Sequence, residues 1–157
     1  MTTLLSISAT EASSSASDVN DCYTFHDVES TWNEARDACH DMGAHLVTME
    51  TTDEWNKVKG FIKEKVKETD SFTHYYIGLQ KESGMWKWTE GRSPGATVAI
   101  DDSRWQSSQP SGDRDPRELC GEIWYPKSGL KGLNDIRCTR RNTQGRDQSR
   151  GYICENY

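Results

Sequence analysis

The stretch QPSGDRDPRELCGEIWYPKSGLKGLNDIRC, residues 109–138, places oxygen-bearing side chains on both sides of two cysteines, in a segment with the composition of loops. Five of these side chains offer oxygen atoms in order along the chain: Gln109, Ser111, Glu118, Asn134 and Asp135. The Asp135 carbonyl can add a sixth oxygen, and calcium takes about six to eight oxygen ligands in flexible geometry. The stretch therefore predicts a calcium site with room for two neighbouring hydroxyls of a sugar.

Further motifs surround this stretch. They read Tyr75-Tyr76-Ile77-Gly78-Leu79, Trp86-Lys87-Trp88-Thr89-Glu90-Gly91 and, near the end, Tyr152-Ile153-Cys154-Glu155. Together with residues 109–138 they resemble the C-type lectin-like domain, from about Cys22 to Glu155. The resemblance implies an α+β fold of two helices, small antiparallel sheets and a long loop region, stabilised by disulfides. It also implies a carbohydrate-recognition domain over residues 21–157.

In that family, three short motifs bind calcium and sugar together: a Glu-Pro-Asn or Gln-Pro-Asp triplet, a Glu just before a cysteine, and a Trp-Asn-Asp triplet. The matching residues here are Gln109-Pro110-Ser111, Glu118-Leu119-Cys120 and Leu133-Asn134-Asp135. The resemblance thus implies that the same five oxygen-bearing side chains hold both ligands. It also implies a cis peptide bond before Pro110. Ser111 and Leu133 depart from the family's pattern.

The charge of the predicted site is lower than the family's pattern. Family sites carry three formal negative charges, whereas only Glu118 and Asp135 are acidic here. Since calcium affinity follows the charge of the ligands, we expect one weakened site. The amide of Gln109 comes first in its triplet, which in this family favours galactose or N-acetylgalactosamine. Ser111 can donate or accept a hydrogen bond, so it leaves the sugar open.

Two alternatives to a calcium-dependent lectin stay open at this point. The first is a lectin-fold protein that binds sugar without calcium. The second is a protein of this fold that binds no sugar: an antifreeze protein, a mineral-associated protein or a protein-recognition domain. No histidine pair with metalloprotease spacing, nucleophile elbow or phosphate loop occurs in the sequence, so an enzyme is not expected.

Five cysteines in one domain favour an oxidising compartment, and we expect a secreted protein. The residues alone permit about fifteen sets of two disulfides. The family resemblance selects Cys39–Cys154 and Cys120–Cys138. Cys22 is then left over. It can be a buried free thiol, form an interchain disulfide in a homodimer, or have lost its partner by truncation.

Length and charge exclude several other classes. The chain has 157 residues, enough for one domain, and a formal net charge of −6 with 28% charged residues. An acidic balance of this kind argues against general nucleic-acid binding. No apolar run approaches the roughly 18 residues of a membrane span. Residues 1–20 are rich in Ser, Thr and Ala and are expected to form a flexible tail.

The sequence also predicts where the two helices begin. Thr31 followed by Glu34 is a capping box, and apolar side chains at helical spacing continue to Gly43, a natural stop. A second helix is predicted from Thr51, which has Glu54 three residues later. Its lysines and glutamates are typical of a solvated face.

Strands are predicted at residues 75–79, 86–88 and 120–125. Residues 89–118 lack periodicity, and such a long loop in a compact domain is usually functional or disordered. We expect a functional one. Between Cys138 and Cys154 the chain carries Arg140, Arg141, Arg146 and Arg150, with Arg137 just before this interval. They are either scattered surface charges or a site for sulfated, sialylated or phosphorylated glycans.

Overall fold

The computed structural model describes residues 22–66, 72–111, 115–125, 129, 131–139 and 149–156. The predicted N-terminal tail, residues 1–20, lies outside them, as do most of the clustered arginines. The elements within these ranges are β1 (Tyr23–His26), α2 (Trp32–Asp41), β2 (His45–Leu46), α3 (Thr52–Val66), β3 (Phe72–Glu82), β4 (Met85–Trp88), β5 (Thr97–Val98), β6 (Cys120–Trp124), β7 (Gly132–Ile136) and β8 (Ser149–Glu155). The predicted α+β class and its two helices are confirmed.

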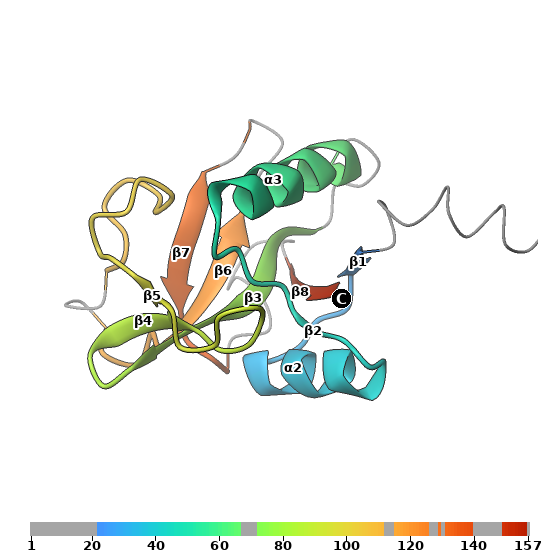
Figure 1. Ribbon diagram of the computed structural model, residues 1–157, viewed down its shortest axis with the longest axis horizontal. Coiled ribbons are helices and arrows are strands. Elements are labelled where there is room, and N and C mark those ends of the chain that lie inside the picture. The colour runs from blue at the N-terminus through green and yellow to red at the C-terminus, as the bar shows by residue number, and fades with distance from the viewer. Residues whose placement is uncertain are drawn as a thin grey trace, which may run out of the picture.

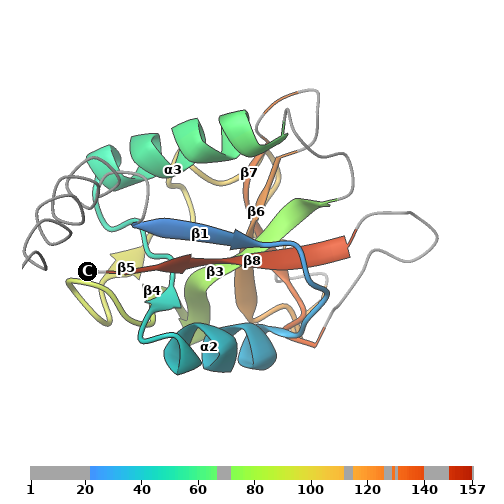
Figure 2. The ribbon, with the colours of Figure 1, turned by 90° about the vertical axis from the view of Figure 1, so that its right-hand side faces the viewer.

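The strands form one sheet rather than separate small ones. Its main path runs β1-β8-β3-β4-β5, with β2 beside β8, and with β6 lying between β3 and β7. Among the strand pairs of the described chain, only β3 and β8 are parallel; the others are antiparallel, as expected. Figure 2 shows α3 and α2 on opposite sides of β1 and β8. The sheet is therefore covered by one helix on each side.

Both helices begin where the sequence predicts. At the start of α2, Glu34 N donates to Thr31 Oγ1 at 3.2 Å, and Thr31 N donates to Glu34 Oε1 at 2.8 Å. This is the reciprocal pattern of a capping box. At the start of α3, Glu54 N donates to Thr51 Oγ1 at 3.2 Å. Gly43 has a φ of 74° just beyond α2, a conformation that glycine adopts at low cost.

Each helix contributes buried side chains to its own side of the sheet. These are Trp55, Val58 and Ile62 from α3, and Trp32, Ala35 and Cys39 from α2. Trp32 also spans the core to donate its indole N–H to the Ile77 carbonyl on β3 at 2.8 Å. Two apolar clusters thus sandwich the central strand β3 and give the sheet a rigid base for its loops.

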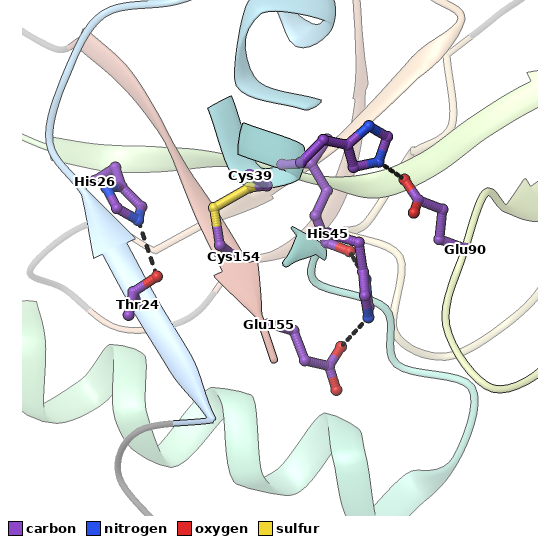
Figure 3. Close-up of a disulfide and its surroundings, with 9 residues drawn as sticks. Thr24, His26, Cys39, His45, Glu90, Cys154 and Glu155 are labelled. Atoms are coloured by element: carbon purple, nitrogen blue, oxygen red, sulfur yellow. Dashed lines mark hydrogen bonds and ion pairs between the residues drawn. A yellow bond between two sulfur atoms is a disulfide. The ribbon is translucent and has the colours of Figure 1, made fainter. Parts of the chain in front are cut away.

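Both disulfides implied by the family resemblance are present. Cys39–Cys154 joins α2 to β8 with a Cα–Cα distance of 5.5 Å (Figure 3). Cys120–Cys138 joins the first residue of β6 to the second residue after the end of β7, with a Cα–Cα distance of 5.1 Å. The 115-residue and 18-residue separations correspond on the chain-entropy model to about 4 to 5 and about 3 kcal/mol of stabilisation.

Cys22 takes part in neither of the two disulfides. It is half-buried against the apolar cluster on the α3 side, and its carbonyl accepts a hydrogen bond from Asn156 N at 2.9 Å. An interchain disulfide through Cys22, and the homodimer that it would make, stay predictions. Within the described ranges, no helix is both long and apolar enough to span a membrane.

Candidate functional site

The long loop between β5 and β6 is held against β7 by backbone hydrogen bonds. Leu133 N donates to the Arg104 carbonyl at 2.9 Å, and Gln106 N donates to the Leu133 carbonyl at 2.8 Å. Gly132 permits this approach, because a Cβ atom there would lie 2.6 Å from the Arg104 oxygen. Leu133 itself is fully buried in the core. The Leu133 departure from the family's Trp therefore affects packing and not the set of oxygen ligands.

This loop path brings Ser111 to two acidic side chains. Ser111 N donates to both carboxylate oxygens of Asp135, each at 2.9 Å. The Ser111 hydroxyl lies 2.9 Å from Glu118 Oε2 and 3.3 Å from Asp135 Oδ1. Three of the five predicted site residues thus meet at one point. We call Glu118 and Asp135 the acid pair.

Glu118 is carried by a short turn that begins at Asp115. Glu118 N donates to the Asp115 carbonyl at 3.1 Å. The Asp115 carboxylate in turn accepts from Arg117 Nε at 3.0 Å and from Arg137 Nε, beyond β7, at 2.7 Å. These bonds lower the pKa of Asp115 to about 2, with the Arg117 backbone N–H as the largest cause. The turn is therefore tied to the strand that carries Asp135.

The acid pair lacks a positive partner among these contacts. Burial raises the pKa of Glu118 above its usual range; the Ser111 hydrogen bond opposes this, and the negative charge of Asp135 adds to it. Two carboxylates that share one hydroxyl repel each other when both are ionised. A divalent cation between them would remove that repulsion, so the electrostatics of the acid pair fit a calcium ion.

Gln109 supplies a second observation that fits a cation. Its side-chain oxygen Oε1 is buried and has no hydrogen-bond partner among the described residues. A buried polar oxygen without a partner costs free energy unless something accepts its lone pairs. The Gln109–Pro110 peptide bond is cis, as the family resemblance implies. Gln109 and Ser111 thus offer neutral oxygens beside the charge of the acid pair.

Asn134 is directed away from the acid pair. Neighbouring residues of a strand point to opposite faces, and Asn134 lies opposite Glu122 while Asp135 lies opposite Gly121 on β6. Asn134 Nδ2 donates to Glu122 Oε1 at 2.9 Å. Within the described chain, no hydrogen bond joins Asn134 to the other four predicted site residues. The Glu122 carboxylate can only accept hydrogen bonds, so it binds the amide nitrogen of Asn134. The side-chain oxygen of Asn134 is the atom that remains for another ligand.

Glu122 belongs to a polar group that the sequence interpretation missed. His74 Nδ1 lies 3.1 Å from the same Glu122 oxygen, and Glu122 and His74 are 0% and 5% exposed. The Trp124 ring stacks on His74 with a centroid distance of 5.5 Å. We call His74, Glu122 and Asn134 the buried cluster. A glutamate in the middle of an otherwise uncharged strand, residues 120–125, was the available signal.

Two tryptophans, Trp105 and Trp124, lie on the segments that carry the site, and both rings pack against other side chains. Trp105 is buried, donates its indole N–H to the Ala99 carbonyl at 2.9 Å, and packs edge-on against Trp86. Trp124 is partly exposed and stacks on His74 of the buried cluster. Trp105 therefore belongs to the core, and Trp124 lies opposite Gly132 of β7, the strand that carries Asp135.

Comparison with known proteins agrees with this architecture. The family model described as "Lectin C-type domain" matches residues 28–156. The C-type lectin domain family 6 member A of Homo sapiens is 31% identical over 125 residues, which cover 78% of this chain and 53% of that protein. The chain thus spans about half the length of this relative.

Solved structures give the same result at the level of the fold. The crystal structure of the C-type lectin domain of murine dendritic cell inhibitory receptor 2, in complex with N-glycan, has a TM-score of 0.61 and 26% identity; the match covers 86% of this chain and 89% of that one. Herring type II antifreeze protein has a TM-score of 0.58 at 21% identity, covering 86% and 89%. At that identity the likeness concerns the fold alone.

Proposed function

The chain belongs to the C-type lectin domain family, and on this premise we propose that it binds carbohydrate through one calcium ion held at the acid pair. The observation that carries the proposal is the meeting of Ser111 with Glu118 and Asp135 at hydrogen-bond distance. Within the described residues neither carboxylate has a positive partner, and two such buried or half-buried carboxylates are costly unless a cation binds there.

Each predicted residue has a role in this proposal. Glu118 and Asp135 supply the negative charge, while Gln109 and Ser111 add neutral oxygens. Asn134 would add its side-chain oxygen only after turning from Glu122 to the face of β7 that carries Asp135. When bound, calcium supplies coordination positions for two neighbouring hydroxyls of a sugar. The carboxylates accept hydrogen bonds from these hydroxyls, and the amides donate to them.

The charge and the first residue of the triplet support two finer proposals. Because the site has two carboxylates, we expect calcium to bind more weakly than to a site with three. The amide of Gln109 supports a preference for galactose or N-acetylgalactosamine over mannose. The disulfides support a protein of an oxidising, extracellular compartment whose partners are glycans and glycoconjugates.

A second candidate function is sugar binding without calcium. It is favoured by the hydrogen bonds that two site residues already make within the protein. Ser111 N donates to both oxygens of Asp135, and Asn134 Nδ2 donates to Glu122, so these groups have partners without an ion. In that case the acid pair accepts hydrogen bonds directly from sugar hydroxyls.

A glycan array, run once with calcium and once with EDTA, tests the proposal. We expect binding to galactose-terminated glycans with calcium and loss of that binding with EDTA. Equal binding in both conditions would support the calcium-independent candidate. Binding in neither condition would remove carbohydrate binding and leave a non-sugar ligand as the function of this fold.

A further inference from the structure

A cavity of about 410 Å³ lies beside the Glu118 turn. Its lining combines two arginines with apolar and small side chains: Pro116, Arg117, Leu119, Arg137, Cys138 and Thr139. Leu119 is 42% exposed, so the apolar part of this wall is open to solvent. The carbohydrate proposal gives this cavity no role.

The two arginines of the cavity are held together by one carboxylate. Arg117 and Arg137 each donate Nε–H to a different oxygen of Asp115, at 3.0 and 2.7 Å. In the described part of the chain, the terminal nitrogens of both guanidinium groups have no hydrogen-bond partner. Each guanidinium therefore keeps four N–H donors. Two positive charges against one negative charge leave the group with a net charge of +1.

The cavity and the acid pair adjoin each other through two connections. The turn from Asp115 to Glu118 carries Arg117 immediately before the acid, so one chain segment supplies both places. Asp135 and Arg137 are two residues apart at the end of β7, and residues two apart on an extended chain point to the same side. Arg117 and Leu119, the residues on either side of Glu118, both line the cavity, so the cavity and the acid pair are neighbours on the surface.

We propose that this cavity is a subsite for an oxyanion on the glycan, either a sulfate ester or a carboxylate, next to the sugar bound at the acid pair. The inference rests on the proposed carbohydrate binding. Guanidinium groups bind oxyanions through paired N–H donors of fixed geometry, and here Asp115 holds two of them in place. Pro116, Leu119 and Cys138 offer an apolar wall for the ring that carries the anion.

The electrostatic gain is moderate because solvent screens the site. The Arg117 side chain is 69% exposed and that of Arg137 is 35% exposed. We therefore expect the anionic form of a glycan to bind about 5- to 10-fold more tightly than its neutral parent. We also expect this advantage to decline with added salt, because exposed charges are screened within about 10 Å at 0.1 M ionic strength.

Three calorimetric probes test the subsite: lactose, 6′-O-sulfolactose and 6′-sialyllactose, each in the presence of calcium; the 6′-substituents leave the neighbouring 3- and 4-hydroxyls of galactose unmodified. For each variant we compare its affinity for an anionic probe with its affinity for lactose, as a ratio. A mutation that weakens the binding of all sugars equally leaves this ratio unchanged. Arg137→Gln and Arg117→Gln should each reduce the wild-type ratio to below about twofold. Arg36→Gln is the matched control, because Arg36 also donates Nε–H to a neighbouring aspartate, at 2.9 Å, but on α2. It should leave the ratio unchanged.

The outcomes separate this inference from the proposed function. A preference for sulfolactose alone assigns a sulfate ester, and a preference for sialyllactose alone assigns a carboxylate; either result supports the subsite. If lactose binds and both anionic probes bind no better, or if the preference survives in both arginine variants, the subsite is wrong and the lectin proposal stands. If none of the three probes binds, the galactose preference and the subsite both fall, and the glycan array alone decides whether the protein binds another carbohydrate. Arg117→Gln alters an exposed side chain, so a folding defect cannot account for its result.

Discussion

The strand β7, which lies beside β6 (Figure 1), carries two polar groups of different character, one on each of its sides. On one side, the buried cluster surrounds a single carboxylate, Glu122, with a histidine and an amide donor. On the other side, the acid pair brings two carboxylates to one serine and raises the pKa of Glu118. The side chains of the adjacent residues Asn134 and Asp135 thus reach two different groups. The first is satisfied within the protein, and the second has no positively charged partner among the described residues. The unsatisfied side is where an external cation gains most.

The largest effect is expected from Glu118→Gln. This change keeps the size of the side chain and removes one of two negative charges, so calcium affinity should fall at least about 100-fold. Thermal stability without calcium should not fall, because the neutral amide removes the repulsion between position 118 and Asp135. Calorimetric calcium titration measures the loss. Glu82→Gln, at an exposed position at the end of β3, is the control. Undiminished affinity would disprove the assignment of Glu118.

Glu122→Leu should act on stability first. It leaves the His74 ring and the Asn134 amide without their shared acceptor inside the protein. Two buried donors that lose their partner cost about 2 to 4 kcal/mol of unfolding free energy in total. Urea unfolding measures this. The double variant His74→Leu/Glu122→Leu should lose less than the sum of the single changes. If the single variant were as stable as the wild type, the buried cluster would contribute nothing to the fold.

Some features of the fold could be predicted from side chains, and others depend on backbone contacts that leave no pattern in the sequence. Thr31 and Thr51 mark the helix starts by side-chain chemistry, and the family resemblance implies both disulfides; all four are confirmed. The path of the long loop along β7 could not be predicted, because backbone groups such as Arg104 O make those contacts. No side-chain pattern records them.

Within the candidate site, the positions of Glu118 and Asp135 were easier to predict than the direction of the Asn134 side chain. Ser111, Glu118 and Asp135 meet as the motif order suggested. Asn134 and Asp135 point to opposite faces because they are neighbours on a strand. This could be predicted only with the bounds of β7, which the sequence pattern did not indicate. The partner of Asn134, Glu122, lies on another strand, so only the strand register reveals it.

Ser111→Asp should strengthen the acid pair's attraction for calcium by about 10-fold, since it restores a third negative charge. The Ser111 hydroxyl lies within 3.3 Å of both acids, so the new carboxylate would face the same point. Ser111→Asn has the same size without the charge and serves as the control. Calorimetric titration of both variants decides: an unchanged or weaker affinity in Ser111→Asp would mean that position 111 does not face the ion.

A smaller effect is expected from pH. Because the pKa of Glu118 is raised in the folded protein, Glu118 takes up a proton at a higher pH than an ordinary glutamate. Calcium affinity should therefore decline on acidification before ordinary carboxylates titrate. The stability of the calcium-free protein should change in the opposite direction. The folded state binds this proton more tightly than the unfolded chain does, so the free energy of unfolding rises as the pH falls. Calcium titrations and unfolding at several pH values would show both trends, and Glu118→Gln should remove them.

The most direct test of the calcium-dependent lectin account is sequential calorimetry on the wild-type protein. Calcium is titrated first, then galactose, and the sugar titration is repeated in EDTA. The account predicts one calcium per chain and a heat of galactose binding that appears only after calcium is bound. A galactose heat of equal size in EDTA would contradict it, as would a protein that takes up no calcium at the acid pair.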